Sequence, residues 1–114
     1  MTIRTMQEIL NADVLYGKDL LETNIGFVFS SDMMSDVLAY GESSSVLLTG
    51  LCNPQVVRTA EMLDIVCIIF VRGKMPDERM LSLARSKGIV ILATSHFMFT
   101  SCGLLYQSGL RGGA

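Results

Sequence analysis

The sequence predicts an α/β protein of three layers (α/β/α), with a central, largely parallel sheet of about five strands. Three times, a short apolar run ends in a polar turn that opens a helical segment: VLLTG before NPQVVRTAEML, IVCIIFVRG before MPDERMLSLARSK, and IVILATS before HFMFTSCGLLYQ. Strands that alternate with helices in this way form a parallel sheet covered on both faces. The 114 residues are enough for one domain with a substantial core.

The first half of the chain predicts two helices and three strands. Thr5 and Glu8 fit the S/T-x-x-E capping box, which places a helix start near Met6. A later helix is expected to be capped by one of the polar residues of Ser30-Ser31-Asp32 and to end at Gly41. The expected elements are a helix over 6–10, strands over 12–16 and 25–29, a helix over 33–40 and a strand over 46–49.

The second half carries stronger helix signals. Asn53 followed by Pro54 is typical of a cap and a first helical position. Pro76 and two acids open another helix, whose last turn carries two basic residues before Gly88. The expected elements are a helix over 53–63, a strand over 66–71, a helix over 76–87, a strand over 89–93 and a helix over 97–107. We expect a single domain over 1–110 and a flexible tail over 111–114.

Composition excludes several classes of function. Nine basic residues against eleven acidic ones give a net charge of -2, and the basic residues are scattered, so nucleic-acid binding is not expected. The longest apolar run, 65–71, is too short to cross a membrane, and the amino terminus lacks a secretory signal, so we expect a cytoplasmic protein. Three cysteines without C-x-x-C spacing predict neither a disulfide scaffold nor a metal site.

The last expected helix is apolar nearly all round and contains Gly103, where another backbone can approach. Such a helix is either sandwiched within the fold or covers the sheet on one side and meets a partner on the other. Because a chain this short has little room for a third layer over one helix, we expect a homodimer through apolar helices including 97–107.

Parallel strands end at one edge of their sheet, and ligands of such folds bind there. Polar and glycine residues of this chain follow three expected strands at that edge. The candidate ligand-binding residues are Thr49, Gly50, Asn53, Arg72, Gly73, Lys74, Thr94, Ser95 and His96.

These candidates also have purely structural interpretations. The turn from Thr49 to Asn53 can hold an anion at a helix start, but it lacks the G-x-x-x-x-G-K-[ST] loop, and a capped turn without a ligand is the preferred interpretation. Arg72 and Lys74 supply two cations, which are either an anion contact or simply solvated. His96, the only histidine, is expected to be neutral near a helix start.

Two further groups have simpler interpretations. Asp32 and Asp36 are four residues apart, but two carboxylates alone make a weak cation site, so we interpret them as a helix cap and a solvated side chain. Cys52 precedes a helix start, where the helix dipole favours a thiolate, although packing is the more usual role of such a cysteine.

From Leu47 onward, the order LTG, NPQVVRTAEMLDIVCIIFVRG and MPDERMLSLARSKGIVILATSHFMFTSCGLLYQSG resembles the DRTGG domain, a small α/β module. It is similar, more distantly, to the amino-terminal domain of HPr kinase/phosphorylase. The segments MQEILNADVLYGKDL and 31–39 resemble stand-alone members of the DRTGG family. Family members typically have Gly-Asp-Arg after the strand where this chain has Gly50-Leu51-Cys52. The resemblance therefore implies that a charged ligand contact carried by that Asp-Arg pair is missing here.

The resemblance implies a regulatory or dimer-forming module. The family occurs between adenine-nucleotide-sensing CBS domains in regulated pyrophosphatases, inside phosphotransacetylases and as free-standing proteins, some of them associated with iron-only hydrogenase systems and two-component sensors. It has no established catalytic residues, so none is carried over to this chain.

We therefore expect a non-catalytic regulatory or ligand-sensing and dimerisation module, binding an adenine nucleotide or another small anion at the carboxyl edge of the sheet, without a cofactor. Two alternatives remain open. One is a small phosphoryl- or acyl-transfer enzyme that uses Ser95, His96 and Arg72. The other is a structural adaptor in a hydrogenase-linked or signalling assembly, with Cys52 as an incidental or reactive thiol.

Overall fold

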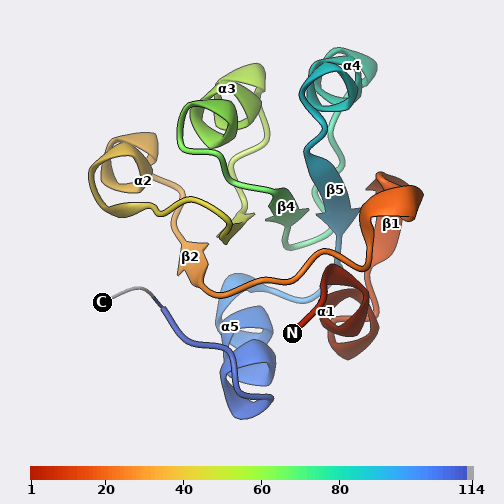
Figure 1. Ribbon diagram of the computed structural model, residues 1–114, viewed down its shortest axis with the longest axis vertical. Coiled ribbons are helices and arrows are strands. Elements are labelled where there is room, and N and C mark those ends of the chain that lie inside the picture. The colour runs from red at the N-terminus through yellow and green to blue at the C-terminus, as the bar shows by residue number, and fades with distance from the viewer. Residues whose placement is uncertain (113–114) are drawn as a thin grey trace.

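Five strands form one sheet in the order β1-β5-β4-β3-β2 (Figure 1). The computed structural model describes residues 1–112. Strands β2, β3, β4 and β5 are parallel, and β1 pairs with β5 in the antiparallel direction. The elements are α1 (Ile3–Ile9), β1 (Asp13–Tyr16), η1 (Lys18–Leu20), β2 (Val28–Ser30), α2 (Met34–Tyr40), β3 (Val46–Thr49), α3 (Pro54–Met62), β4 (Cys67–Phe70), α4 (Glu78–Lys87), β5 (Val90–Ala93) and α5 (Met98–Gln107).

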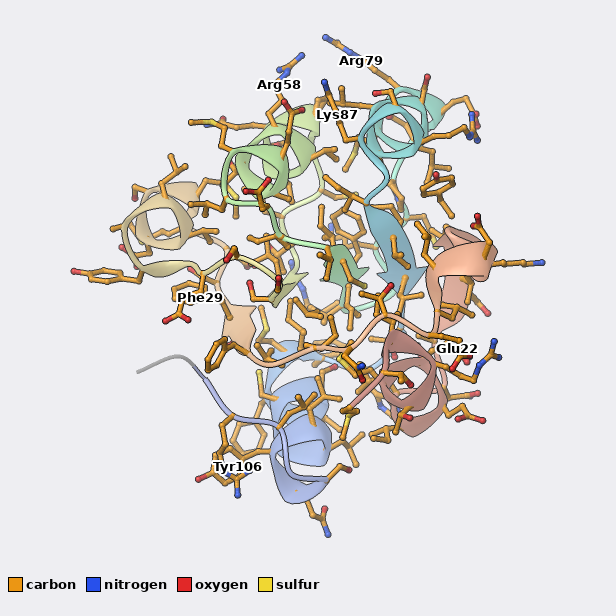
Figure 2. The ribbon with its side chains drawn as sticks, viewed as in Figure 1. Glu22, Phe29, Arg58, Arg79, Lys87 and Tyr106 are labelled. Atoms are coloured by element: carbon orange, nitrogen blue, oxygen red, sulfur yellow. The ribbon has the colours of Figure 1, made fainter. Side chains whose placement is uncertain are left out.

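Helices cover both faces of the sheet. Figure 1 shows α2, α3 and α4 on one face and α1 and α5 on the other. Arg58 and Arg79 lie on the outer side of α3 and α4, and Tyr106 lies on the outer side of α5 (Figure 2). The predicted three-layer architecture with a largely parallel sheet is therefore confirmed.

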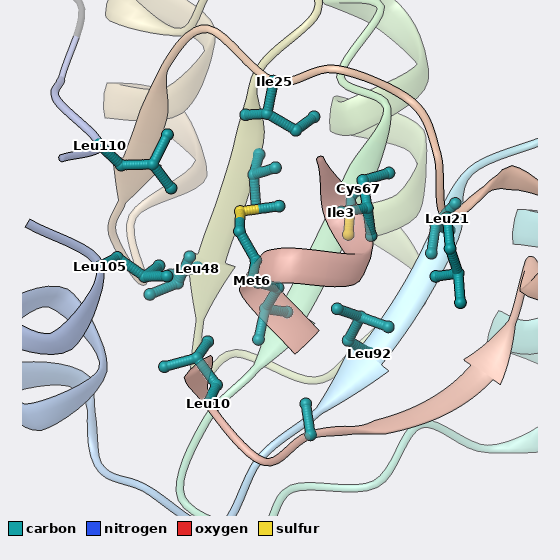
Figure 3. Packing of buried hydrophobic residues seen from close by; sticks show 14 of the residues in the cluster. Ile3, Met6, Leu10, Leu21, Ile25, Leu48, Cys67, Leu92, Leu105 and Leu110 are labelled. Carbon is teal, nitrogen blue, oxygen red and sulfur yellow. The ribbon is translucent and has the colours of Figure 1, made fainter. Parts of the chain in front are cut away.

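The central strands are apolar on both faces because each face is buried under a layer of helices. Val46 and Leu48 of β3 belong to the core beneath α1 and α5, whereas Leu47 between them belongs to the core beneath α2, α3 and α4. Strands β4 and β5 alternate in the same way. Figure 3 shows the first of these cores, in which Met6 and Leu105 pack over the sheet beside Leu48.

The first helix differs from the expectation. It begins at Ile3, and Thr2 is its cap, because the Thr2 hydroxyl accepts a hydrogen bond from the Thr5 N–H at 3.2 Å. The predicted capping box at Thr5 is therefore wrong. The earlier start places Ile3 and Met6 on one face of the helix, where both are fully buried in the core.

Strand β2 is shorter than predicted and begins later in the chain, at Val28 instead of Ile25. Residues 25–27 lie before the strand, and the Ile25 N–H donates to the Met1 carbonyl at 2.7 Å rather than to the sheet. Of the expected tail 111–114, only residues as far as Gly112 are described. Arg111 pairs with Phe27, and the Val28 N–H donates to the Arg111 carbonyl at 3.1 Å. Residues 113 and 114 lie outside the described part of the chain.

Helices α3 and α4 are capped by side chains. Asn53 caps α3 by accepting the Val56 N–H at 3.3 Å, as predicted. Asp77 caps α4 in the same way through the Met80 N–H at 2.9 Å, so Pro76 and Asp77 precede the helix instead of lying in its first turn. Gly88 ends α4 in the left-handed conformation, with a φ of 69°, which favours glycine.

Candidate functional site

The four parallel strands end at one edge of the sheet, and backbone hydrogen bonds connect two of the loops that leave it. The Arg72 N–H, after β4, donates to the carbonyl of His96, after β5, at 2.8 Å. The Gly73 N–H donates to the Thr94 carbonyl at 3.0 Å. Arg72 and Gly73 both have left-handed backbones, with φ of 62° and 70°. This turn holds the two predicted segments side by side.

The two threonines of the predicted site are buried and have structural roles. Thr94 is 2% exposed; its hydroxyl donates to the Leu10 carbonyl at 2.8 Å and accepts from the His96 N–H at 3.3 Å. Thr49 is fully buried and accepts the Leu51 N–H at 3.1 Å. Both hydroxyls therefore hold loops in place, and neither reaches the surface.

Asp32 belongs to this edge, although sequence reasoning interpreted it as a cap of α2. One of its carboxylate oxygens accepts the Gly50 N–H at 2.7 Å and the Thr49 hydroxyl at 3.1 Å. The residue at the cap position of α2 is Met33, which makes no capping bond, and the Met33 N–H donates to the Ser31 hydroxyl instead. The capping role of Asp32 is therefore wrong. Its carboxylate ties the loop after β2 to the loop after β3.

Gly50 lies beneath the side chain of Arg72. A Cβ atom built on Gly50 would lie 2.7 Å from a terminal nitrogen of Arg72, so the guanidinium rests directly on the glycine. Arg72 and Lys74 are exposed, and neither forms an ion pair with a carboxylate of residues 1–112. The edge therefore offers two cations, one of them set in a defined place by Gly50.

Two backbone donors of the loop after β3, the Gly50 and Leu51 N–H groups, are already occupied, and so is the Val56 N–H at the start of α3. Asp32 accepts from Gly50, Thr49 accepts from Leu51, and Asn53 accepts from Val56. The Gly50 and Leu51 N–H groups are therefore not available to an anion at this edge, where the side chains of Arg72 and Lys74 supply the positive charge.

The surroundings of Cys52 favour the neutral thiol over the thiolate. Partial burial raises the pKa of its thiol, the nearby Asp77 carboxylate raises the pKa further, and the Lys74 ammonium lowers it by less. The side chain packs against the core beneath α2, α3 and α4. The position before Asn53 suggested that the helix dipole favours a thiolate, whereas partial burial and Asp77 raise the pKa of the Cys52 thiol.

Ser95 and His96 lie in the loop before α5 and not in the helix itself, which begins at Met98. Ser95 is exposed and His96 is half-buried. Within residues 1–112, no side-chain hydrogen bond joins Ser95, His96 and Arg72, and the contact of His96 with Arg72 is made by backbone atoms. A nucleophile paired with a base is therefore not assembled there.

Hollows of the described surface lie away from the loops after β3, β4 and β5, and three of them are well formed. One lies between α5 and β2, one at the ends of α3 and α4, and one on the outer side of α3 and α4. None of the three is lined by a predicted site residue. Within residues 1–112, no three His, Cys, Asp or Glu side chains come together as a metal site.

Comparison with known proteins identifies the class of the domain. A model of the DRTGG domain matches residues 5–108, and the chain belongs to that family. No helix within residues 1–112 has the length and apolar character needed to cross a membrane. A search of curated proteins found no match.

One similar solved structure contains the CBS and DRTGG domains of the regulatory region of the Clostridium perfringens pyrophosphatase, complexed with its activator, diadenosine tetraphosphate. The two chains are 18% identical, and the TM-score is 0.78. The match covers 94% of this chain and 46% of that one, so this chain spans about half of the regulatory region. At this identity the likeness establishes the shared fold.

Proposed function

We propose that this DRTGG domain is a non-catalytic regulatory module that binds an adenine nucleotide or another small anion at the carboxyl edge of its sheet, and that it self-associates through α5. The position of Arg72 is the observation that supports ligand binding at this edge. Its guanidinium rests on Gly50 without an acidic partner within residues 1–112. Guanidinium groups bind phosphate oxygens in a bidentate geometry.

The surroundings of Arg72 favour a preformed contact. The backbone of Arg72 is fixed by its bond to His96, and Gly50 beneath it is fixed by Asp32. A contact group held in place before binding loses less conformational freedom when the ligand arrives. The related regulatory region binds a nucleotide activator, which makes adenine nucleotides the first compounds to test.

A thermal-shift series with adenine mono-, di- and triphosphates tests the ligand half. A ligand that binds only the folded chain stabilises it by mass action, by about 2.7 kcal/mol at a hundred times its dissociation constant. We expect a concentration-dependent rise in melting temperature that Arg72→Gln weakens. A flat response across the series would reject nucleotide binding.

The matched control is Arg85→Gln. Arg85 is also exposed, and its guanidinium carbon lies 5.9 Å from the centre of the Tyr16 ring, away from the strand-end edge. Both substitutions remove one positive charge. If they reduce the nucleotide response equally, net charge explains the effect and the assignment of Arg72 is wrong.

The outer face of α5 supports self-association. Phe97, Phe99 and Tyr106 are 66%, 88% and 61% exposed, while Leu105 of the same helix is buried against the sheet. Burying one phenylalanine is worth about 1.5–3 kcal/mol, and a two-fold dimer buries each such side chain twice.

Sedimentation tests the dimer. We expect a dimer at micromolar concentration, and Phe99→Asp should raise its dissociation constant by about 100-fold or more. Met62→Asp is the control, since Met62 is 71% exposed on α3 at the opposite face of the sheet. A wild-type chain that stays monomeric, or equal effects of both variants, would contradict self-association through α5.

A further inference from the structure

A basic groove lies between the outer sides of α3 and α4, and it contains none of the residues proposed to bind a ligand at the carboxyl edge of the sheet. Its volume is about 310 Å³. Arg58 comes from α3, and the other lining residues come from α4: Arg79, Ser82, Leu83 and Ser86. Positions three and four apart share one face of a helix, so the four residues of α4 form a single stripe that faces the groove.

The two arginines of this groove, Arg58 and Arg79, have no ion-pair partner among the described residues. The acidic residue nearest along the stripe of α3, Glu61, is paired instead with Lys87 of α4 at 3.3 Å. Figure 2 shows the labelled Arg58 and Arg79 side chains on the outer side of α3 and α4.

Two hydroxyl groups of α4 line the same groove and add hydrogen-bonding capacity to it. Ser82 and Ser86 are exposed on the same stripe. The Ser86 hydroxyl donates to the Leu83 carbonyl at 2.8 Å, and Ser82 makes no side-chain hydrogen bond to residues 1–112. Two guanidinium groups and a free hydroxyl are the donors that hold phosphate oxygens, and each guanidinium can bind two oxygens at once.

The size of the hollow indicates a small ligand. Pockets for small molecules have volumes of about 300–1,000 Å³, and this one lies at the lower end of that range. Two cations that line one hollow favour a ligand with at least two negative charges over a single carboxylate. Leu83, in the lining, gives the hollow one apolar contact.

The geometry points to a second anion site, in which Arg58 and Arg79 bind a small ligand that carries phosphate groups. It is separate from the strand-end edge, because none of its lining residues follows the carboxyl end of a strand. It also stands independently of the proposed function, since neither Arg72 nor Gly50 takes part.

Inorganic tripolyphosphate is a suitable probe, titrated into the isotope-labelled full chain and followed by the amide signals of each residue. We expect saturable shifts at Arg79, Ser82 and Ser86. In the double variant Arg58→Gln/Arg79→Gln, the dissociation constant from these signals should rise about 10-fold or more, as when charge-assisted hydrogen bonds are lost. Both arginines are exposed, and the melting temperature of the variant checks that it folds.

Two single variants are the controls. Arg85→Gln removes a charge from another side of α4, and Arg72→Gln removes the strand-end cation. Neither variant should change the dissociation constant of tripolyphosphate, measured from the amide signals of Ser82 and Ser86, by more than about a factor of two. If Arg85→Gln weakens tripolyphosphate binding as much as the double variant does, net charge explains the effect. If the amide shifts are confined to residues 72–74, the anion binds only at the carboxyl edge of the sheet. Either result, or shifts that never saturate, overturns the second site.

Discussion

Replacing Asp32 by alanine removes the carboxylate that joins the loops after β2 and β3. This carboxylate accepts two hydrogen bonds, at 2.7 Å from the Gly50 N–H and at 3.1 Å from the Thr49 hydroxyl. Gly50 and Thr49 are buried, so both donors lose a partner that the protein cannot replace nearby. Asp36→Ala is the matched control, because Asp36 is exposed and lies in the first turn of the short helix that follows.

A hydrogen bond to a charged group contributes about 1.5–3 kcal/mol to stability. Asp32 is exposed, so water can enter the vacated space and satisfy part of the loss. We therefore expect Asp32→Ala to lower the free energy of unfolding by about 2–3 kcal/mol. Asp32→Asn keeps an acceptor oxygen and should lower it by about 1 kcal/mol. The control loses only a favourable interaction with the helix dipole, which is worth about 0.3–1 kcal/mol.

Urea denaturation measures these differences. With a slope of about 1–3 kcal/mol per molar urea, Asp32→Ala should move the midpoint down by about 0.7–3 M. The order of stability should be wild type, then Asp32→Asn, then Asp32→Ala. If Asp32→Ala and Asp36→Ala unfold at the same midpoint, the carboxylate does not hold the edge together and the description of the site is wrong.

The cysteines give two further predictions. Burial raises the pKa of the Cys67 thiol far above its ordinary value of 9.0. Above pH 9 the thiol therefore loses its proton in the unfolded chain but keeps it in the folded chain, which favours unfolding. The free energy of unfolding should therefore fall by about 1.4 kcal/mol for each pH unit above 9. In Cys67→Ala, the free energy of unfolding measured with urea should not show this dependence on pH. Because burial and Asp77 raise the pKa of Cys52, a thiol reagent at pH 7 should label Cys52 in the folded Cys102→Ala chain more slowly than a small free thiol. Labelling of Cys52 faster than that reference would show an activated thiolate.

Local signals in the sequence predicted the helices and the position of the edge. Asn53 before Pro54 and the glycine at position 88 mark helix ends by their own chemistry, whatever lies around them. The apolar strands followed by polar turns predicted that Arg72 and His96 would lie at a common edge, and their loops are hydrogen-bonded there.

Other features depend on contacts between distant parts of the chain. The role of Asp32 requires β2 to lie beside β3, and strand order cannot be read from a single sequence. Gly50 beneath Arg72 requires the loops after β3 and β4 to meet. The basic hollow depends on how α3 and α4 are rotated relative to each other, so Arg58 and Arg79 appear in the sequence only as scattered charges.

Calorimetric titration of Gly50→Ala with an adenine nucleotide tests most directly whether the edge beneath Arg72 binds the ligand. The added methyl group would lie 2.7 Å from the Arg72 guanidinium, which can swing away because it is the end of a long, exposed side chain. Gly26→Ala is the control, since no atom lies within 4 Å of its added methyl group. We expect Gly50→Ala to weaken nucleotide binding about 5- to 10-fold without changing the charge of the protein. This change corresponds to a loss of about 1–1.4 kcal/mol of binding free energy. Gly26→Ala should leave the affinity unchanged. Equal affinities for wild type, Gly50→Ala and Gly26→Ala would contradict a ligand site at this edge.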